Sequence, residues 1–496
     1  MKENNESEKN FVNESLKDNE QQIKSEKLLL KPSRMTKKDK EKEHFEESEN
    51  KTQIELKLYE ESPSRFYILV SYCFCIFASG FQWLSFTSLP FFSNHYEISQ
   101  WKVDFFSLIY NIEYLVLFIP ILILSENLSV KNTFRISSLC ILIGSFLKIF
   151  INKDKSLAVS YIGQIISGVS RPYLMVIQGK LSADWFKENR RNFICTICFL
   201  SDIAGILIGY IWNLAYIKKI ENNRDDYRDH VYRYFLAEFV LVFIFCIPAL
   251  FVEVDKPENP VSPSRQNNMN LFGKESLRDI FSNYKYICAM FSIFLIGGYF
   301  YVMSLKFINL VSIYNLDKNK SDLVYSISVT VGIASSLIIS FILDKYKKYK
   351  IFLIILASIS TISQVFLTFL LELVESKNLN AYAISIIFYI LINGSVIPYY
   401  CFIINYICEI TYPVSECIAI AFIIAVTQIY NIFGNFLYKY ILEKSDKKYM
   451  SNLLFIIFFF VSTILTFFYQ DKLYRYEIDK DEENQKDNKN NAMIIN

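Results

Sequence analysis

The chain alternates long apolar runs with short polar connections. A helix rises 1.5 Å per residue, so about 20 apolar residues cross the hydrocarbon core of a bilayer. Twelve runs have about this length, at 66–92, 103–124, 134–151, 157–181, 193–216, 234–252, 285–313, 322–343, 351–373, 381–407, 417–440 and 452–469. The pattern predicts an all-α integral membrane protein with twelve transmembrane helices.

The polar segments divide the chain into five parts. Residues 1–64 are rich in Lys, Glu, Asn and Ser, which predicts a disordered N-terminal tail. Six runs fall within 65–252 and six within 285–470, and a polar linker with three prolines, 253–284, separates these two halves. The charged, Asn-rich stretch 471–496 is predicted to be a second disordered tail.

Lys and Arg in the short loops predict the orientation in the membrane. The connections after the second, fourth and eighth runs are basic, whereas the connection Ser93 to Trp101 has no Lys or Arg. This distribution places both tails and the linker in the cytoplasm. The connections after the fifth and eleventh runs are also basic, although this orientation places them outside.

The composition of the chain limits the classes of molecule that it is expected to bind. The 496 residues are 52% hydrophobic, and the net charge of +2 comes without a large basic face, which argues against a nucleic-acid partner. The ten cysteines fall almost entirely inside apolar runs, where they are expected to pack as small hydrophobic residues. We therefore expect a monomer whose partners are the lipid bilayer and a small-molecule substrate.

Motifs for catalysis are missing from the sequence. The three histidines, His44, His95 and His230, lie outside the apolar runs. There is no HExxH, P-loop, nucleophile elbow or zinc-type Cys/His cluster. We expect no enzyme activity, no cofactor and no metal site.

The first run carries the triplet Phe81-Gln82-Trp83 a little past its middle. Tryptophan in membrane proteins usually lies at the interfaces, and a buried amide without a partner is costly. A cavity beside Gln82 and Trp83 explains this better than lipid does. Packing of Trp83 against a neighbouring helix is the alternative.

An internal offset relates the two halves. Trp83 and Tyr301 are 218 residues apart, and so are Glu126 and Asp344, which follow the second and eighth runs. In two related halves, equivalent residues occupy opposite walls of one central cavity. The offset therefore predicts that Trp83 and Tyr301 face each other.

Glu113, Arg171, Asp202 and Lys306 are ionisable residues inside apolar runs, where charges are expensive and point to function. Arg171 requires a counter-ion, and either Glu113 or Asp202 could supply it. One interpretation is an ion pair that fixes helix packing. The other is a gate or a contact with substrate.

A second motif, Glu409-Ile410-Thr411-Tyr412-Pro413 followed by Ser415-Glu416, connects the tenth and eleventh runs. Pro413 is expected to stop one helix and Ser415 to cap the next, with Glu416 near its positive end. The motif is a turn first and a cytoplasmic gate by inference. In the eleventh run, the amide of Gln428 could face the cavity.

These motifs, together with Gly163-Gln164, Trp185-Phe186 and the run Leu343-Asp344 to Tyr349-Lys350, resemble the feline leukaemia virus subgroup C receptor (FLVCR) branch of major facilitator transporters over residues 66–470. The resemblance implies two six-helix halves around a central cavity. It also implies transport of choline, ethanolamine or haem by alternating access.

The resemblance further implies roles for single residues. A Trp of the first span and a Tyr of the seventh flank the quaternary ammonium in that family, and they match Trp83 and Tyr301. A glutamine of the eleventh span matches Gln428. We expect the substrate-binding residues to be Trp83, Tyr301, Gln428 and Gln82, and the gate or turn residues to be Asp344, Glu409, Tyr412, Pro413 and Glu416.

The chain departs from the family at its charges. Arg171 stands where the family has Gln, and Glu113 and Asp202 replace apolar or neutral residues. An unneutralised Arg171 would repel a cation.

The leading hypothesis is still a facilitator for choline or ethanolamine, because aromatic faces suit a quaternary ammonium. Haem transport is the alternative, and a receptor or scaffold without transport is the third. The plasma membrane is the expected location, with an organelle membrane as the alternative.

Overall fold

The computed structural model describes residues 61–86, 99–152, 157–221, 227–266, 274–313, 318–375, 379–444 and 450–481. The predicted disorder of 1–60 and 482–496 falls outside these residues, and so does His95. Every regular element in the described ranges is a helix, which confirms the predicted all-α class.

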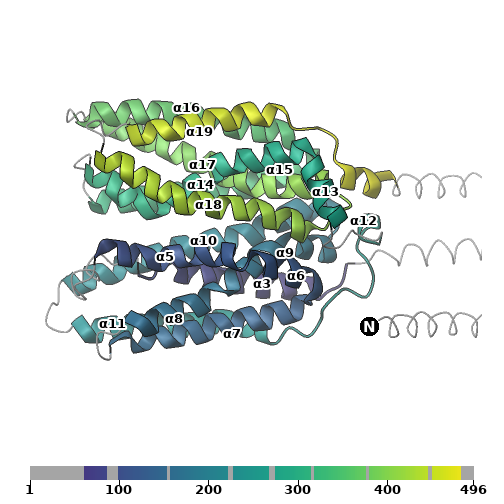
Figure 1. Ribbon diagram of the computed structural model, residues 1–496, viewed down its shortest axis with the longest axis horizontal. Helices are drawn as coiled ribbons and strands as arrows, with labels where there is room; N and C mark the ends of the chain where they lie inside the picture. The colour runs from purple at the N-terminus through teal and green to yellow at the C-terminus, as the bar shows by residue number, and fades with distance from the viewer. Residues whose placement is uncertain are drawn as a thin grey trace, which may run out of the picture. The chain divides into compact units, whose positions relative to one another are not determined.

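Two groups of long helices lie side by side, and Figure 1 shows them as separate layers. The first group contains α3 (Arg65–Trp83), α5 (Gln100–Val116), α6 (Phe118–Asn127), α7 (Val130–Lys148), η1 (Ile149–Asn152), α8 (Leu157–Gly168), α9 (Ser170–Trp185), α10 (Glu188–Glu221) and α11 (Tyr227–Leu250). The second contains α14 (Tyr284–Ile313), α15 (Lys318–Tyr346), α16 (Tyr349–Glu375), α17 (Leu379–Ile410), α18 (Glu416–Lys444) and α19 (Met450–Phe467). Between them in sequence lie α12 (Pro263–Gln266) and α13 (Lys274–Ser282).

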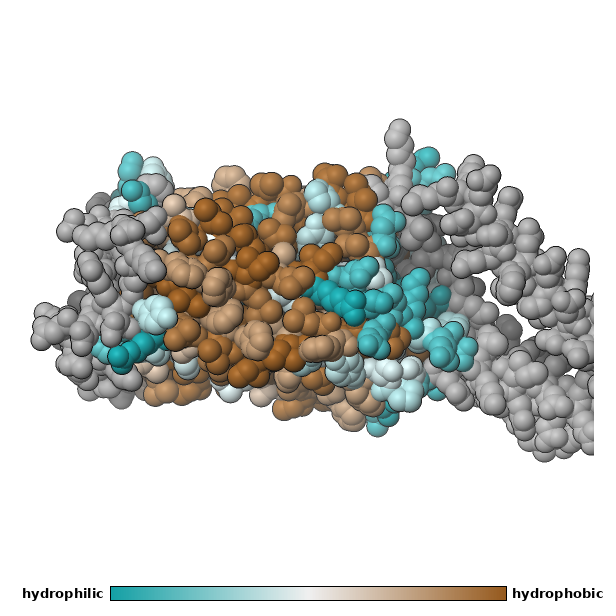
Figure 2. Space-filling model, turned by 90° about the horizontal axis from the view of Figure 1, so that it is seen from below, coloured by the Kyte–Doolittle hydropathy of each residue, from teal (hydrophilic) through white to brown (hydrophobic). Residues whose placement is uncertain are grey.

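Nine of the described helices are long and apolar enough to cross a membrane. The pair α5 and α6, bent by 65°, makes a tenth span, and α19 is a shorter apolar helix. Helices α8 and α9 occupy the fourth predicted run. The count of twelve spans stays a prediction. The middle of the molecule is covered by a band of apolar side chains, with hydrophilic residues toward the ends (Figure 2).

Two of the predicted spans are broken in the same way. The breaks at Leu117 and Val169 each precede a proline by three residues. Pro120 and Pro172 have no N–H to donate to the carbonyls four residues earlier, so the helical ladder is interrupted there. Proline alone does not decide the outcome, because α11 and α17 each contain a proline without a break.

The first helix is shorter than predicted. The apolar run was expected to be helical through Phe92, but α3 ends at Trp83. Two carbonyls at its end accept hydrogen bonds from side chains. Ser85 Oγ donates to Gln82 O at 2.8 Å, and Asn213 Nδ2 donates to Leu84 O at 3.0 Å. Helix ends need such partners, and here α10 supplies one of them.

Two further expectations are wrong. His230, expected in an outer loop, lies in the first turn of α11 and is buried, because the helix begins ahead of the apolar run. The C-terminal segment, residues 471–481, was expected to be disordered, but 474–481 are helical. Buried Arg475 and Asp479 hold this segment against the helix ends, beside α12 and α13 (Figure 1).

Candidate functional site

Trp83 and Tyr301 come from the two separate helix groups and meet in the middle of the molecule. Their ring centroids are 5.8 Å apart at 81°, an edge-to-face contact. Both side chains are buried. Tyr400 extends the cluster, with its ring centroid 6.2 Å from that of Tyr301. Trp83 Nε1 donates to Ser107 O at 3.0 Å, which fixes the indole against α5. The offset between the halves therefore predicted a contact that the fold makes.

Arg171 lies directly over the indole of Trp83, with its guanidinium carbon 5.3 Å from the ring centroid. Its Nη2 donates to Asp202 Oδ2 at 2.6 Å, and both side chains are buried. The predicted need for a counter-ion is met by Asp202, from α10. The protein's own cation thus occupies the best cation–π face in the site.

Glu113 is not the partner of Arg171. Its carboxylate packs against Gly168, where a Cβ atom would overlap with it unless the Glu113 side chain shifted. Neither carboxylate oxygen of Glu113 has a hydrogen-bond partner in the described part of the chain. The side chain of Lys306 lies outside the described residues.

Gln82 is turned away from the aromatic contact. Its Oε1 accepts from Lys148 Nζ at 3.2 Å, and Lys148 forms an ion pair with Glu238 at 3.5 Å. Consecutive residues of a helix point about 100° apart, so Gln82 and Trp83 face different neighbours. The expectation that Gln82 contacts substrate is therefore not supported. Sequence reasoning also missed Lys148 and Glu238, although charged residues inside apolar runs were the available signal.

A small polar cavity of about 10 Å³ lies beside the aromatic contact. It is lined by Tyr110, Asn111, Tyr114, Arg171, Pro172, Met175, Tyr301 and Gln428. This volume is roughly enough for one water molecule, so the conformation is closed around the site. Gln428 lines the cavity as expected, and its Oε1 accepts from Asn431 Nδ2 at 3.2 Å.

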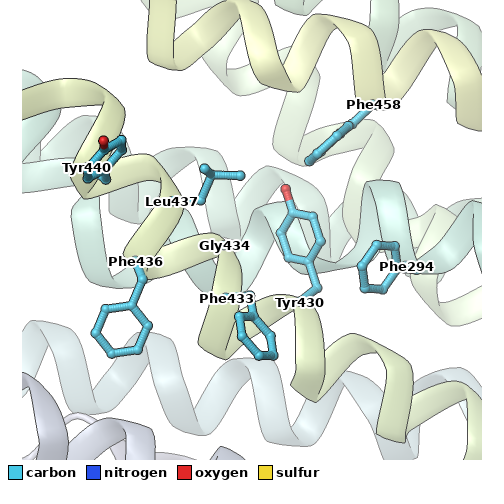
Figure 3. Close-up of a pocket in the computed structure, with 8 residues that line it drawn as sticks. All are labelled: Phe294, Tyr430, Phe433, Gly434, Phe436, Leu437, Tyr440 and Phe458. Atoms are coloured by element: carbon cyan, nitrogen blue, oxygen red, sulfur yellow. The ribbon is translucent and has the colours of Figure 1, made fainter. Parts of the chain in front are cut away.

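A larger groove of about 640 Å³ lies elsewhere, among α14, α18 and α19. Figure 3 shows the ring of Tyr430 between Phe294 and Phe458 at its floor. Phe433 and Phe436 beside it are 67% and 60% exposed. Its lining is almost wholly apolar, which suits contact with lipid chains rather than a charged solute.

The motif after α17 belongs to a second polar region at the ends of the helices. Glu416 meets two arginines: Oε2 is 3.2 Å from Arg265 of α12, and Oε1 is 2.8 Å from Arg475. Arg265 also pairs with Asp184 of α9. We call these four residues, with Arg191, Glu409 and Asp479, the end network. It joins both helix groups, the linker and the C-terminal segment.

Electrostatics in the end network favours the charged forms of its arginines. Burial alone would lower the pKa of Arg265, but Asp184 and Glu416 outweigh it and raise that pKa. Burial opposes the charge of Arg475 in the same way, and Glu416 raises its pKa. The network therefore stays ionised while it is buried.

The other expected gate residues surround this network. Asp344 accepts from the backbone N–H groups of Asn192 and Phe193, at 3.3 and 2.7 Å. Tyr412 Oη donates to the carbonyl of Ser264 at 3.2 Å. Glu409 pairs with Arg191 at 3.9 Å and accepts from the N–H of Tyr476 at 3.0 Å, and Pro413 lies in the turn before α18.

Two features of the end network escaped the sequence reasoning. Ser415 was expected to cap α18, but its hydroxyl donates to the carboxylate of Glu126 instead. Arg265 and Arg475 lie in segments read as linker and disordered tail, and their charge gave no reason to place them in a buried network.

Comparisons with known proteins identify the fold and the family. The Major Facilitator Superfamily profile matches residues 70–413. The FucP transporter in its outward conformation has a TM-score of 0.62 at 12% identity, covering 81% of this chain and 98% of that one. This likeness confirms the expected fold.

Curated relatives match at low identity. An uncharacterised MFS-type transporter from Caenorhabditis elegans, C09D4.1, is 24% identical over 60% of this chain. The human choline/ethanolamine transporter FLVCR2 is 23% identical over 48%, and FLVCR1 of the cat is 23% identical over 58%. The matches span 51%, 46% and 52% of these relatives, about half of their length.

The resemblance to the FLVCR branch is thus confirmed at the level of homology. The helices and the family together make the chain a multi-pass integral membrane protein. Members of this family move small molecules and are generally not enzymes. The match over residues 70–413 covers more than half of the sequence, and the chain belongs to the Major Facilitator Superfamily.

Proposed function

We propose that this protein transports a small organic amine of the choline or ethanolamine class by alternating access. Two of the relatives described above are named for these substrates. The observation that carries the proposal is the contact between Trp83 and Tyr301, one from each helix group. Relative motion of the two groups would part these rings and open both aromatic faces to a substrate.

The chemistry of the aromatic contact fits this class. A quaternary ammonium cannot donate hydrogen bonds, and each desolvated aromatic face contributes up to about 2 kcal/mol. Trp83, Tyr301 and Tyr400 form one cluster, and Gln428 adds an amide on the cavity wall. In the closed conformation Arg171 covers Trp83, so substrate binding requires that the guanidinium shift.

The end network supports an alternating mechanism. It holds the two groups together on one side, because Arg191 of α10 pairs with Glu409 of α17, and Arg265 pairs with both Asp184 of α9 and Glu416 of α18. Opening toward that side has to break these contacts, whereas opening toward the other side leaves them intact. We propose that the network is the gate on its side of the membrane.

We also propose that this side is cytoplasmic and that the protein resides in the plasma membrane. Two hydrogen bonds join segments that were predicted to be cytoplasmic. Glu61, before α3, accepts from the N–H of Lys187, between α9 and α10, and the N–H of Ser264 in the linker donates to Asp479 of the C-terminal segment. Glycosylation tags in loop 93–101 should be modified, and tags in linker 253–284 should not. The reverse pattern would overturn the orientation.

Haem is the competing cargo. Tyrosine is one of the side chains that hold haem iron, and Tyr110, Tyr114 and Tyr301 line the cavity. Among the residues that line it, however, there is no His or Cys. A membrane receptor or scaffold without transport would have little use for a buried guanidinium beside a cavity.

The test is flux in vesicles that contain the purified full-length protein. Labelled choline, ethanolamine and haem are compared in one preparation, with Trp83→Ala as the site variant. Phe341→Ala is the matched control, because it also removes an aromatic ring but lies 70% exposed on α15. Amine flux that falls in Trp83→Ala and not in the control supports the proposal. Amine flux that is absent, or equal in all three proteins, rejects it, and haem flux alone selects the competing cargo.

A further inference from the structure

The wall of the central cavity carries a charge of one sign. Among the described residues that line it, Arg171 is the only ionisable group that is charged at neutral pH. This cavity presents a guanidinium, two amides and three phenol groups.

The cavity also has hydrogen-bond donors that no protein acceptor meets. Arg171 Nη1 and Asn111 Nδ2 are buried and have no hydrogen-bond partner in the described part of the chain. The hydroxyls of Tyr301 and Tyr110 lie beside Arg171 and Ser167, and since a guanidinium can only donate, the O–H of Tyr301 remains available as a donor. The side chains of Arg171, Asn111, Tyr110 and Tyr301 are 6%, 4%, 3% and 2% exposed. Buried donors left unpaired cost free energy, so their convergence on one cavity calls for a ligand that accepts hydrogen bonds.

We infer that the preferred substrate is a small zwitterion, with an oxyanion beside its ammonium group, and that Arg171, Asn111 and the two tyrosines bind the oxyanion. The inference rests on the proposed function and names the substrate class for the same site. A carboxylate offers about four acceptor positions, whereas the single hydroxyl of choline accepts at most two hydrogen bonds.

The nearby carboxylates of Asp202 and Glu113 do not accept hydrogen bonds from these unpaired donors. Asp202 Oδ2 is bound to Arg171 Nη2, and its Oδ1 faces Gly80 of α3. Glu113 faces Gly168. Arg171 can therefore keep Asp202 on one nitrogen and offer the other to an oxyanion. A shift of the guanidinium toward the oxyanion would also free the face of Trp83 for the ammonium group.

Charge balance favours the same substrate. The Arg171–Asp202 pair carries no net charge, and a bound zwitterion adds none beside it. Bound choline would add one uncompensated positive charge beside Arg171, inside the membrane-spanning region. Uncompensated charge at that depth is expensive.

The experiment compares choline with N,N,N-trimethylglycine, in which a carboxylate replaces the hydroxymethyl group. Both are measured as flux in vesicles containing the full-length protein. Phosphocholine, whose phosphate monoester makes it a net anion at neutral pH, is a third arm that separates carboxylate from phosphate. We expect trimethylglycine or phosphocholine to exceed choline at least about tenfold in kcat/KM. Asn111→Leu, which removes one donor, should lower zwitterion flux more than choline flux.

A charge-balanced variant provides the second measurement. Arg171→Gln combined with Asp202→Asn removes the guanidinium without leaving an unpaired acid, and should reverse the preference toward choline. Choline preferred by the wild type, or a preference unchanged in both variants, overturns the inference and leaves the proposed amine transport standing. If neither amine nor zwitterion is carried and Trp83→Ala behaves like wild type, the proposed function itself has failed.

Discussion

Two polar cavities of about 10 Å³ each, one in the centre and one at the end network, differ in how their charges are met. The end cavity is lined by both signs of charge, including Arg191, Glu409 and Arg475. Each of these has an ion-pair partner in the end network. In the central cavity Arg171 has one partner, which lies on the neighbouring helix α10 of its own group.

The difference is consistent with the proposed roles, a gate at the end network and a binding site at the centre. At the end, an ion pair between Arg191 of α10 and Glu409 of α17 joins the two helix groups directly, and each arginine there lies next to an acid, although Arg191 Nε and Arg475 Nε have no hydrogen-bond partner among the described residues. At the centre the groups meet through aromatic edges, which release easily, and the polar atoms stay partly unpaired. Four predictions test this difference between the two regions.

The largest effect should come from breaking the central ion pair. Arg171→Gln leaves Asp202 as an uncompensated buried acid, which should lower the free energy of unfolding by about 3–5 kcal/mol. Adding Asp202→Asn should restore most of it. Thermal unfolding in detergent measures both. If the double variant is no more stable than the worse single variant, the pair does not contribute as the structure indicates.

The gate should respond next. Arg191→Ala removes the arginine of α10 that pairs with Glu409 of α17 and with Asp479, and it should weaken the closed end by about 2 kcal/mol, the usual range for a hydrogen bond to a charged group. Cys408 lines the same cavity, so its labelling by a maleimide, followed by peptide mass spectrometry, should accelerate at least about tenfold. Lys472→Ala is the control, because Lys472 is 58% exposed and pairs only at the surface. Equal labelling in both variants would contradict the gate.

Removing the aromatic face of Trp83 should change the free energy by less than the two preceding substitutions, and its specific effect should be on transport. Trp83→Ala should reduce the kcat/KM of amine flux at least about tenfold, which is about 1.4 kcal/mol. Trp83→Phe keeps a weaker face and should lose less. Matched surface expression is needed, since loss of a buried Trp also destabilises. Undiminished flux in well-expressed Trp83→Ala would exclude the aromatic site.

The smallest effect should come from Tyr301→Phe, which keeps the ring. If the ring alone matters, flux should change less than in Trp83→Phe, and the measurement is the same uptake assay. If the hydroxyl also binds an oxyanion, this variant should lower zwitterion flux while choline flux stays level. A loss shared by all substrates would instead indicate a packing role for Tyr301.

The sequence alone determined the class, the family and the centre of the site. Apolar runs of bilayer length require helices whatever their neighbours are, because backbone groups in lipid need internal partners. The shared offset between the halves predicted that Trp83 meets Tyr301, and burial of Arg171 demanded a counter-ion. These conclusions depend on local composition or on symmetry, which can be read from a single chain.

The tertiary structure decided the rest. Which acid pairs with Arg171, and whether Gln82 or Trp83 contacts Tyr301, depend on how each helix is rotated about its axis. Apolar runs without a clear polar face leave that rotation open. The place of Arg475 in the end network required the C-terminal segment to fold back onto α18, through contacts between residues far apart in sequence. Hydropathy reports how deep a residue lies in the membrane, and only packing determines which residue it touches.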